Sequence, residues 1–463
     1  MKRHRFDPEI LREYDIRGVT GVTLNAADAY AIGRSFASAV HRVGGSRIAV
    51  GYDGRLSSPA LERALVEGIM ASGATAVRIG LGPTPMLYYA EASGGDIDAG
   101  IQITGSHNPR DHNGFKFVLQ GRPFYGADIQ RLGTMAAAGD WDEGAGRAEE
   151  RAVLDAYVAR LLEGLAGVDP AGLSALRIGW DAGNGAAGPA LERLAASLPG
   201  EHHLLFTQVD GHFPNHHPDP TIEANLADLK ALVAREKLDF GVAFDGDADR
   251  IGAVDGSGRV IWGDQLIAIF AEDLLRRHPG ATVVADVKAS RTLFDAIARN
   301  GGHPVMGRSG HSLVKAKMRE TGALLGGEMS GHVFFADDYY GFDDGLYAAV
   351  RLMAAVVRLG RTLADLREAM PETFSTPELR FPAPEARKFA AVEEVRARLA
   401  EAGAQVVDID GVRVTTQDGW WLLRASNTQA VLTARAESDT GAGLERLIGE
   451  IDAQLALCGL SRG

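Results

Sequence analysis

Short apolar runs alternate with amphipathic stretches along the first two thirds of the chain. Residues 47–52 and 76–79 are apolar enough to form buried strands. Between them, Leu61 and Leu65 mark the apolar face of a helix, and the Ser-Pro pair at 58–59 favours Ser58 as its N-cap. A strand, a helix and a second strand in this order predict parallel pairing with a right-handed crossover.

The same order of strand, Asp, turn and helix occurs three times. Residues 59–63 and 189–193 share the letters PALER, and each segment follows a strand that ends in Asp. A third copy has its strand at 283–286 and its helix through Leu293 and Ile297. Repetition of one supersecondary unit predicts an α/β protein with three related domains, each with a mixed, mostly parallel sheet.

The C-terminal part of the chain has a different pattern. Residues 406–409, 412–415 and 420–423 resemble short strands separated by Asp-Gly turns, which predicts an antiparallel meander. Helical patterns at 387–402 and 440–455 flank these strands. We therefore expect a fourth domain of the α+β class.

The length of 463 residues exceeds what one hydrophobic core supports, so several domains are expected. We interpret the proline-containing stretch at 371–384 as the linker to the last domain. The predicted domains are residues 1–152, 153–256, 257–371 and 372–463.

Charge and composition exclude several classes of partner. The net charge of −13 disfavours nucleic acid and an acidic membrane surface. Cys458 is the single cysteine, which excludes an intramolecular disulfide. The first residues lack the apolar stretch of a signal peptide, and no apolar run of about 18 residues occurs. We expect a soluble cytoplasmic protein that must gather positive charge locally to bind an anionic ligand.

The segment Thr-Gly-Ser-His-Asn-Pro at 104–109 follows an apolar strand and places Ser106 on a tight turn. Gly105 permits an unusual backbone conformation, and Pro109 prevents continuation of the strand. A hydroxyl in this position can act as a nucleophile or as a carrier of a phosphoryl group. An ordinary turn is the alternative, since these residue types are common in turns.

Three carboxylates, Asp245, Asp247 and Asp249, follow the apolar strand at 240–244. Like charges at this spacing repel one another unless a cation binds them, so we predict a divalent metal site. A calcium-binding helix–loop–helix is excluded, because its loop requires Glu at the position of Gly256. A solvated acidic turn is the remaining alternative.

Two later loops carry groups suited to a phosphosugar, although a turn with capping side chains is the alternative for both. After paired glycines, Glu328 and Ser330 can grip vicinal sugar hydroxyls, and His332 can move a proton near neutral pH. The second loop offers a guanidinium, hydroxyls and an amide to a phosphate monoester, from Arg424, Ser426, Asn427 and Thr428. Positive groups also fall near predicted strand ends, namely Arg17, Lys116, Lys288 and His311.

These motifs, in this order, resemble the α-D-phosphohexomutase superfamily, in particular its bacterial phosphomannomutase/phosphoglucomutase group. The similarity runs from Tyr-Asp-Ile-Arg-Gly at 14–18 to the segment at 424–428, essentially the whole chain. It implies four domains around a central cleft and an enzyme that interconverts hexose 6-phosphate and hexose 1-phosphate through a phosphoserine and a 1,6-bisphosphate. It also implies Mg²⁺, a hexose bisphosphate such as glucose 1,6-bisphosphate as activator, and a small phosphosugar as partner. We expect a monomer, with a dimer as the alternative.

The resemblance further implies the role of each motif residue. Ser106 would be the phosphoserine, and its phosphate would complete a metal shell formed by Asp245, Asp247 and Asp249. Glu328 and Ser330 would hold sugar hydroxyls. The phosphate that is not transferred would be held by Arg424, Ser426, Asn427 and Thr428. The cleft would also be lined by Tyr14, Arg17, Lys116, Arg250, Lys288, His311 and His332, of which Arg17, Lys116 and His332 would aid proton transfer.

Two positions depart from related patterns. Met329 stands where phosphoglucosamine mutases usually carry Gln, yet such a mutase remains an alternative. Ala430 stands where the family usually carries Pro, and its less restricted φ is expected to weaken phosphate binding. The sequence does not decide between mannose and glucose. A metal-dependent phosphatase and a non-catalytic protein that binds sugar phosphates are further alternatives.

Overall fold

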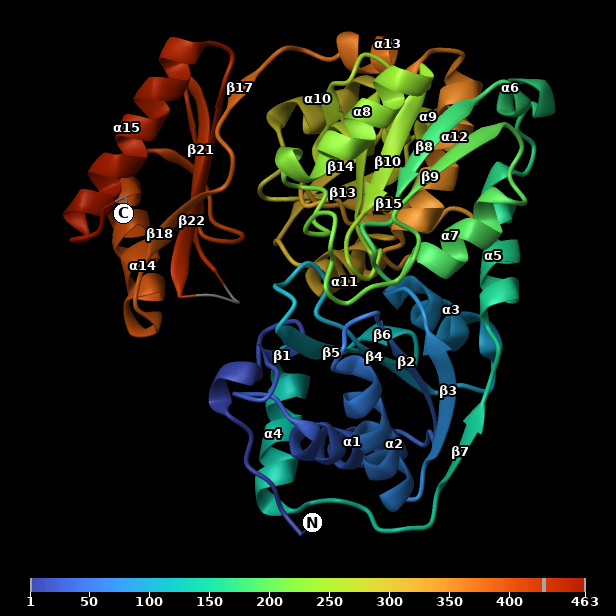
Figure 1. The fold of residues 1–463 in the computed structure, drawn as a ribbon. Coiled ribbons are helices and arrows are strands. Elements are labelled where there is room, and N and C mark those ends of the chain that lie inside the picture. The colour runs from blue at the N-terminus through green and yellow to red at the C-terminus, as the bar shows by residue number, and fades with distance from the viewer. Residues whose placement is uncertain (1, 427–429, 462–463) are drawn as a thin grey trace.

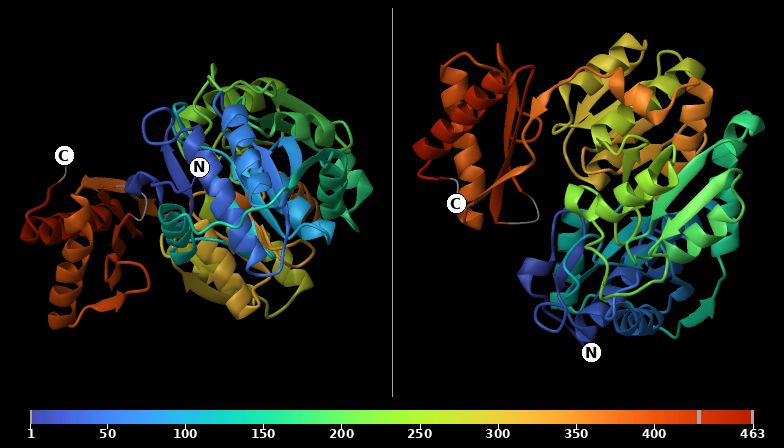
Figure 2. Two further views of the ribbon diagram at one scale, coloured as in Figure 1. Left: turned by 90° about the horizontal axis from the view of Figure 1, so that it is seen from below. Right: turned by 45° about the horizontal axis from the view of Figure 1, so that its top comes forward.

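The computed structural model describes residues 2–426 and 430–461. They form four sheets, each covered by helices (Figure 1). The first sheet, in blue, lies below the second and third, and the C-terminal sheet stands to one side of the other three in all views (Figure 2).

The first sheet has the strand order β1-β5-β4-β2-β3-β7, with β6 paired to β5. Parallel pairing joins β4, β2, β3 and β7, whereas β5 pairs antiparallel with both β4 and β1. The strands are β1 (Ile16–Val19), β2 (Arg47–Tyr52), β3 (Thr75–Leu81), β4 (Ala99–Ile103), β5 (His112–Leu119), β6 (Arg122–Pro123) and β7 (Arg147–Glu150). The helices are α1 (Ala26–His41), α2 (Ser58–Ala71), α3 (Thr84–Gly94) and α4 (Ala127–Ala138).

The second sheet has the order β12-β11-β10-β8-β9, parallel at β8, β9 and β10 and antiparallel beyond β10. Its strands are β8 (Arg177–Asp181), β9 (Glu201–Leu205), β10 (Phe240–Phe244), β11 (Ile251–Asp255) and β12 (Val260–Ile261). The helices of this part are α5 (Leu154–Leu162), α6 (Pro170–Ser174), α7 (Gly188–Ala195) and α8 (Ala227–Glu236).

The third sheet has the order β14-β13-β15-β16, and only the pair β15 and β16 is antiparallel. Its strands are β13 (Thr282–Asp286), β14 (His303–Gly307), β15 (Leu325–Gly327) and β16 (Val333–Phe335). The helices of this part are α9 (Gly263–Arg277), α10 (Arg291–Arg299), α11 (His311–Thr321), α12 (Gly345–Leu359) and α13 (Leu363–Glu368). The predicted mixed sheets with parallel centres are therefore confirmed.

The fourth sheet is the predicted antiparallel meander, with the order β17-β22-β21-β20-β19 and β18 paired to β22. Part of the predicted linker is therefore not loop, since it forms two edge strands of this sheet. The strands are β17 (Phe374–Ser375), β18 (Leu379–Pro382), β19 (Gln405–Val407), β20 (Val412–Thr416), β21 (Gly419–Ala425) and β22 (Val431–Ser438). The helices are α14 (Glu385–Glu401) and α15 (Gly441–Leu457).

The repeated strand-Asp-turn pattern has a structural counterpart at the ends of β2, β8 and β13. Asp53, Asp181 and Asp286 are fully or almost fully buried there. Each accepts hydrogen bonds from a neighbouring loop: Asp53 from the amide of Gly105, Asp181 from the amide of Gly183, and Asp286 from the amide of Met329, at 2.8–3.2 Å. These buried carboxylates hold loops at the carboxyl ends of the central strands.

Ser58 is not the N-cap of α2, contrary to the sequence prediction. Ser57 precedes the helix, and Ser58 is its first residue. The Ser58 hydroxyl donates to Asp53 Oδ1 at 2.6 Å instead of capping a helix amide. The Ser58 oxygen accepts from Asn113 Nδ2 at 2.9 Å, so the hydroxyl is engaged by two side chains rather than by a helix amide.

The cores explain how the parts are joined. One continuous apolar cluster contains residues of the first three sheets and of α5 and α12, including Leu87, Tyr157, Trp180 and Phe335. The fourth sheet has a separate core. Among the described residues, a small cluster of Val287, Trp420 and Leu422 connects it to the third sheet. No helix in the described part of the chain is both long and apolar enough to cross a membrane.

Candidate active site

A cleft of about 910 Å³ lies where the four domains meet. It is lined by the predicted binding residues of the described chain: Tyr14, Arg17, Ser106, Lys116, Arg250, Lys288, His311, Glu328, Ser330, His332, Arg424 and Ser426. Asn427 and Thr428 lie outside the described residues. Residues as far apart in sequence as Tyr14 and Ser426 therefore share one cavity of the size that small-molecule ligands occupy.

Three loops of this cleft have the same position in their sheets. The loop with Ser106 joins β4 to β5, the loop with Asp245 joins β10 to β11, and the loop with Glu328 joins β15 to β16. Each of these strand pairs is antiparallel. The reversal of direction brings every loop back beside the carboxyl end of a parallel strand, where α/β sheets bind ligands.

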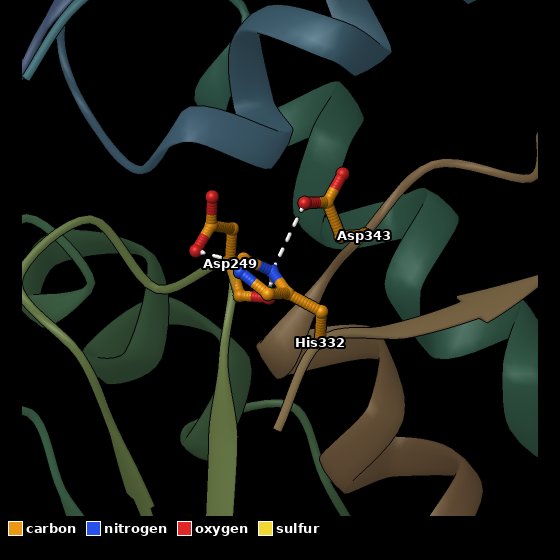
Figure 3. A group of neighbouring side chains, drawn as sticks. All are labelled: Asp249, His332 and Asp343. Atoms are coloured by element: carbon orange, nitrogen blue, oxygen red, sulfur yellow. Dashed lines mark hydrogen bonds and ion pairs between the residues drawn. The ribbon is translucent and has the colours of Figure 1, made fainter. Parts of the chain in front are cut away.

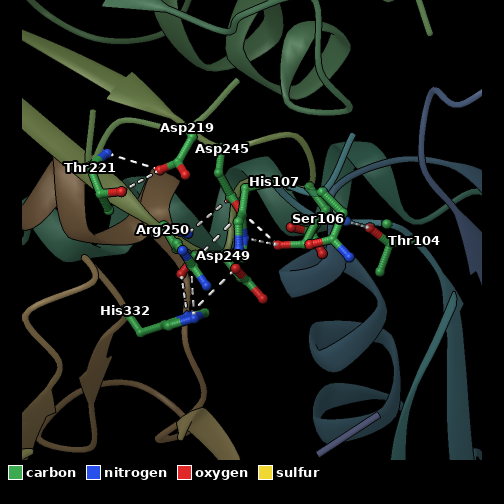
Figure 4. Close-up of polar contacts among 12 residues, drawn as sticks. Thr104, Ser106, His107, Asp219, Thr221, Asp245, Asp249, Arg250 and His332 are labelled. Carbon is green, nitrogen blue, oxygen red and sulfur yellow. Dashed lines mark hydrogen bonds and ion pairs between the residues drawn. The ribbon is translucent and has the colours of Figure 1, made fainter. Parts of the chain in front are cut away.

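Ser106 points at the acidic loop of the second sheet (Figure 4). Its Oγ donates to Asp245 Oδ2 at 2.8 Å and lies 3.1 Å from His107 Nδ1. The unusual backbone conformation lies at Ser106, with φ of 50°, rather than at Gly105 as the sequence suggested. The hydroxyl is thus held against a carboxylate by a backbone conformation that non-glycine residues seldom adopt.

Asp245, Asp247 and Asp249 are fully buried, and their ligand atoms lie within 4.8 Å of one another. Asp247 Oδ1 and Asp249 Oδ1 accept no hydrogen bond from any described residue. Buried carboxylate oxygens without a donor are costly unless a cation binds them. An all-oxygen set of this kind fits a hard divalent cation such as Mg²⁺.

Lys116 is the positive group inside this acidic pocket. Its Nζ lies 2.8 Å from Asp247 Oδ2 and also contacts Asp249 Oδ2. Burial opposes the charge on the ammonium, but the two carboxylates outweigh it and hold the pKa of Lys116 well above its usual value. Burial raises the pKa of Asp245, and the charges of its two neighbours add to that rise.

His332 is held in one tautomer by groups on both sides of its ring. Arg250 Nε donates to His332 Nε2 at 3.1 Å, so Nε2 is the acceptor. The proton then resides on Nδ1, which lies 3.1 Å from Asp343 Oδ2 and 3.2 Å from the Asp249 carbonyl (Figure 3). This leaves the acceptor nitrogen on the side of Arg250, at the cleft.

Asp249, His332 and Asp343 also have the spacing of metal ligands. The ammonium of Lys315 lies 2.8 Å from Asp343 Oδ1, and Arg250 occupies the other ring nitrogen. Two fixed cations beside these groups disfavour a third positive charge. We interpret this cluster as a hydrogen-bonded support for His332 rather than as a metal centre.

The predicted sugar-binding loop is fixed by main-chain contacts. Glu328 is almost fully buried, and its Oε1 accepts from the amide of Gly310 at 2.7 Å. Burial raises the pKa of this carboxyl. Ser330 and His311 line the cleft beside it. A carboxylate and a hydroxyl therefore face the cavity from one loop.

The wall of the cleft formed by the third and fourth domains, opposite Ser106, carries basic side chains. Arg424 is buried and pairs with Asp410 Oδ2 at 3.1 Å, and Lys288 Nζ lies 3.4 Å from Glu378. Near the first sheet, Arg17 donates to Asn108 Oδ1 at 3.0 Å, and the Tyr14 hydroxyl donates to the Ser309 carbonyl at 2.8 Å. This arrangement gathers positive groups in a chain whose net charge is −13, as the sequence analysis required.

Comparison with known proteins identifies the family. The models of phosphoglucomutase/phosphomannomutase domains I, II, III and the C-terminal domain match residues 8–142, 155–258, 262–374 and 378–454. The chain belongs to the phosphoglucomutase/phosphomannomutase family. The phosphohexomutase resemblance, the four-domain fold and the isomerase class are thereby confirmed.

Individual members of the phosphoglucomutase/phosphomannomutase family are similar over nearly the whole chain. A phosphomannomutase/phosphoglucomutase of Pseudomonas aeruginosa is 44% identical over 95% of this chain and 93% of its own length. A phosphoglucomutase of Neisseria gonorrhoeae is 42% identical over 95% of both chains. The crystal structure of a family protein from Burkholderia thailandensis is 43% identical, covers 98% of each chain and has a TM-score of 0.91.

Several polar residues of this phosphohexomutase site were not found by sequence reasoning. Thr84 Oγ1 donates to Asp247 Oδ2 at 2.5 Å, and Asp219 lines the cleft on the side of Arg250. Asp343 lies beside the ring of His332, and Arg55 donates to the Ser106 carbonyl. No local motif marks Thr84, Asp219 or Asp343. Arg55 does have a signal, because it follows the first of the repeated strand-end aspartates.

Proposed function

We propose that this phosphohexomutase interconverts the 6-phosphates and 1-phosphates of mannose and glucose, with Ser106 as the phosphoryl carrier. One observation carries the proposal: the Ser106 hydroxyl lies 2.8 Å from Asp245, at the floor of a cleft whose opposite wall is cationic. A phosphoryl group on Ser106 would face the free hydroxyl of a sugar phosphate held by that wall. We further propose that the four domains are divided at residues 152, 256 and 371, as the sequence predicts.

The reaction then consists of two half-reactions, and each transfers one phosphoryl group between Ser106 and the sugar. The bond from Ser106 Oγ to phosphorus breaks as the free sugar hydroxyl bonds to phosphorus, giving a 1,6-bisphosphate and an unmodified serine. The proton of the attacking hydroxyl passes to His332 Nε2, which gives up its hydrogen bond from Arg250, and a proton returns to Ser106 Oγ as the serine departs. Lys116 and Arg17 are further groups in proton transfer. After the bisphosphate turns end over end, its other phosphate returns to Ser106.

The chain's own residues supply positioning and charge. Glu328 and Ser330 hold sugar hydroxyls, while Arg424, Ser426, Asn427 and Thr428 hold the phosphate that is not transferred. Tyr14, Lys288 and His311 line the cleft between these two groups. Arg250 lies 4.0 Å from Asp245 Oδ2 and can stabilise charge on the transferred group. In such a transfer the protein contributes mainly positioning and electrostatic stabilisation.

Asp245, Asp247 and Asp249 would hold Mg²⁺ in this proposal, with an oxygen of the Ser106 phosphate as a further ligand. The bound ion would supply neutralisation of charge at the transferred phosphoryl group. Glucose 1,6-bisphosphate or an equivalent hexose bisphosphate would phosphorylate the enzyme and so act as activator. A cytoplasmic location, a monomeric state, and the absence of nucleic-acid and membrane partners remain predictions from the sequence.

Intact mass before and after treatment with glucose 1,6-bisphosphate tests the carrier. We expect a gain of one phosphoryl group, mapped to Ser106 by peptide sequencing. A Ser106→Ala variant should gain no mass and lose mutase turnover, while Ser93→Ala, which changes an exposed serine of α3, should behave as wild type. Unchanged turnover of Ser106→Ala would reject Ser106 as the carrier, whereas absence of turnover in both proteins would favour a protein that only binds sugar phosphates.

Substrate comparison separates the enzymatic alternatives. Turnover should be highest with mannose 1-phosphate or glucose 1-phosphate, whereas preference for glucosamine 1-phosphate would indicate a phosphoglucosamine mutase. The amount of inorganic phosphate released during turnover is the second measurement. A mutase retains the phosphoryl group on sugar and serine, so steady release of inorganic phosphate at the rate of turnover would indicate a phosphatase.

A further inference from the structure

The turn that carries Ser106 is built around one buried guanidinium that does not line the cleft. The side chain of Arg55 is fully buried between this turn and Asp53. Its nitrogens donate to four main-chain carbonyls of the turn: Ser106 at 2.7 Å, Asn108 at 2.6 Å, Pro109 at 2.6 Å and His112 at 2.9 Å. One side chain therefore binds three carbonyl groups of the turn and a fourth at the start of β5.

Only arginine has the geometry for this role. Its planar fork carries five N–H donors in fixed directions, whereas lysine presents three donors from a single nitrogen. The remaining direction is used by Arg55 Nε, which donates to Asp53 Oδ2 at 3.2 Å and so balances the buried charge. The same Asp53 oxygen accepts from the amide of Gly105 at 3.1 Å, which ties the start of the turn to this pair.

Two glycines permit close packing around Ser106 and Arg55. A Cβ added at Gly105 would lie 2.3 Å from Arg55 Nε and 2.4 Å from its Cζ, so this glycine leaves room for the guanidinium. A Cβ added at Gly246 would lie 2.5 Å from the Ser106 carbonyl oxygen. The acidic loop therefore contacts the same carbonyl that Arg55 binds.

The backbone of Ser106 needs such support, because a φ of 50° is unfavourable for a residue with a side chain. Conformations of this kind persist only where the surroundings impose them. The second domain adds one more contact, from His217 Nε2 to the His107 carbonyl at 2.6 Å. The carbonyls of Ser106 and His107 are thus fixed from outside the turn.

We propose that Arg55 is a positioning residue for phosphoryl transfer, which fixes the Ser106 backbone so that Oγ faces Asp245 in both half-reactions. Arg55 touches neither sugar nor transferred phosphate. The inference rests on the proposed phosphoserine mechanism. If the guanidinium is lost, the turn relaxes toward common φ values and the phosphoryl group moves away from the line of attack.

An Arg55→Lys variant of the full chain tests this role. The protein is treated with glucose 1,6-bisphosphate, its phosphorylated fraction is read from intact mass, and turnover of glucose 1-phosphate is measured. We expect kcat per phosphorylated molecule to fall about 100-fold, because a displacement of about 1 Å has that effect on a reacting group. KM should change by less than about threefold, because the groups that hold the sugar lie on other loops.

Arg34→Lys is the matched control. Arg34 is another buried guanidinium of the first domain, which donates to Ser72 Oγ at 2.9 Å and to the Asp142 carbonyl at 3.0 Å, away from the cleft. This variant should lose stability but keep kcat per phosphorylated molecule. A similar fall in kcat in both variants, or kcat within about threefold of wild type in Arg55→Lys, overturns the inference.

Two outcomes keep this inference separate from the proposed function. If wild type shows neither phosphorylation nor turnover, the phosphoserine mechanism itself is wrong. If Arg55→Lys does not fold, Gly105→Ala replaces it, because the added methyl group presses on the same guanidinium. We expect the same fall in kcat from Gly105→Ala, and an unchanged kcat would overturn the role of Arg55.

Discussion

At the residue scale, the acidic pocket depends on compensation between opposite charges. Asp245, Asp247 and Asp249 are fully buried, and Lys116 contacts two of them. Removing one partner of a buried charge group leaves the others uncompensated, which costs about 3–5 kcal/mol. Lys116 and a divalent cation therefore stabilise the same carboxylates.

This shared role predicts a metal-dependent stability effect. In EDTA, Lys116→Met should lower the free energy of unfolding by about 3–5 kcal/mol. Excess Mg²⁺ should restore more stability to the variant than it adds to wild type, since binding to the native state alone stabilises it. Thermal unfolding with and without Mg²⁺ measures both effects.

Lys230→Met is the control for loss of a lysine. Lys230 forms a solvent-accessible pair with Glu223 at 2.7 Å, and such pairs contribute about 0–1 kcal/mol. An equal response of wild type and Lys116→Met to Mg²⁺ would show that the ion does not bind beside Lys116.

The sequence predicts which residues carry the candidate chemistry, but it does not predict which residues contact them. Ser106, Asp245 and Glu328 stand out because hydroxyls and carboxylates follow apolar strands. Thr84 and Asp343 contact the site through pairings between distant segments, and no local pattern encodes such contacts. Arg55 was overlooked because the sequence alone does not distinguish a buried arginine near an Asp from the same residues in a solvent-exposed turn.

At the element scale, two glycines set the packing of α1 against α2. A Cβ at Gly33 would lie 2.3 Å from the Leu65 carbonyl oxygen, and a Cβ at Gly68 would lie 2.1 Å from the Tyr30 carbonyl oxygen. The two helices therefore touch backbone to backbone. Neither glycine lines the cleft.

Gly68→Ala should destabilise the protein by about 1–3 kcal/mol, since overpacked contacts force the helices apart. Turnover at permissive temperature should not change. Gly449→Ala in α15 is the opposite case, because nothing lies within 4 Å of its added methyl group. This exposed site should gain about 0.5–1 kcal/mol from higher helix propensity. Urea unfolding of both variants gives the comparison, and effects of equal sign would contradict it.

The start of α12 predicts a pH effect. Asp344 accepts from the amide of Tyr347 at 2.9 Å and from the hydroxyls of Tyr157 and Tyr339, yet burial raises its pKa to about 6 from 3.8. The native state therefore holds this proton more tightly than the unfolded chain does. The resulting stability is present below about pH 4 and is lost as pH rises through about 6.

The difference of about 2 pKa units corresponds to about 3 kcal/mol. We expect the unfolding free energy of wild type, relative to Asp344→Asn, to fall by about 3 kcal/mol between about pH 4 and pH 7. Urea titrations at fixed pH values measure this difference, in which other titrating groups cancel. Parallel pH profiles of the two proteins would rule out a protonated Asp344.

Element prediction from sequence worked where burial patterns are local. The strands at β2, β8 and β13 and the helices α14 and α15 lie within a few residues of the predicted segments. The hairpin partners β5, β11 and β16 were not anticipated, since β5 is mixed in polarity, β16 has three residues and β11 follows the acidic loop without a helix between the strands. Their antiparallel pairing decides where the loops with Ser106, Asp245 and Glu328 lie, so the sequence predicts the candidate residues but not their arrangement in space.

At the scale of the whole molecule, the fourth domain is joined to the third through the turn that presents Lys288. Arg413 donates to the carbonyls of Val287 and Ala289, at 2.5 and 2.8 Å, and its guanidinium stacks on Trp420 at 3.6 Å. Arg435 donates to the Lys288 carbonyl at 2.5 Å. The position of Lys288 is therefore coupled to that of the fourth domain, which carries Arg424, through one set of contacts.

Arg413→Met should loosen this junction while leaving Ser106 and the acidic loop intact. Hydrogen bonds to charged groups contribute about 1.5–3 kcal/mol, so their loss should raise KM for glucose 1-phosphate about tenfold or more. The value of kcat should change by less than about threefold, because none of the groups placed at the transferred phosphoryl lies in the fourth domain. Small-angle scattering should show a larger radius of gyration.

Arg446→Met controls for the loss of an arginine in the same domain, since Arg446 pairs with Asp418 at the surface and away from the third domain. It should change neither KM nor the scattering profile. Contacts such as that of Arg291 with Asp439 remain in Arg413→Met, so the domain should stay attached but sample more orientations. If KM and the scattering profile are unchanged in Arg413→Met, the fourth domain is held by its other contacts, and the Lys288 turn is positioned without it.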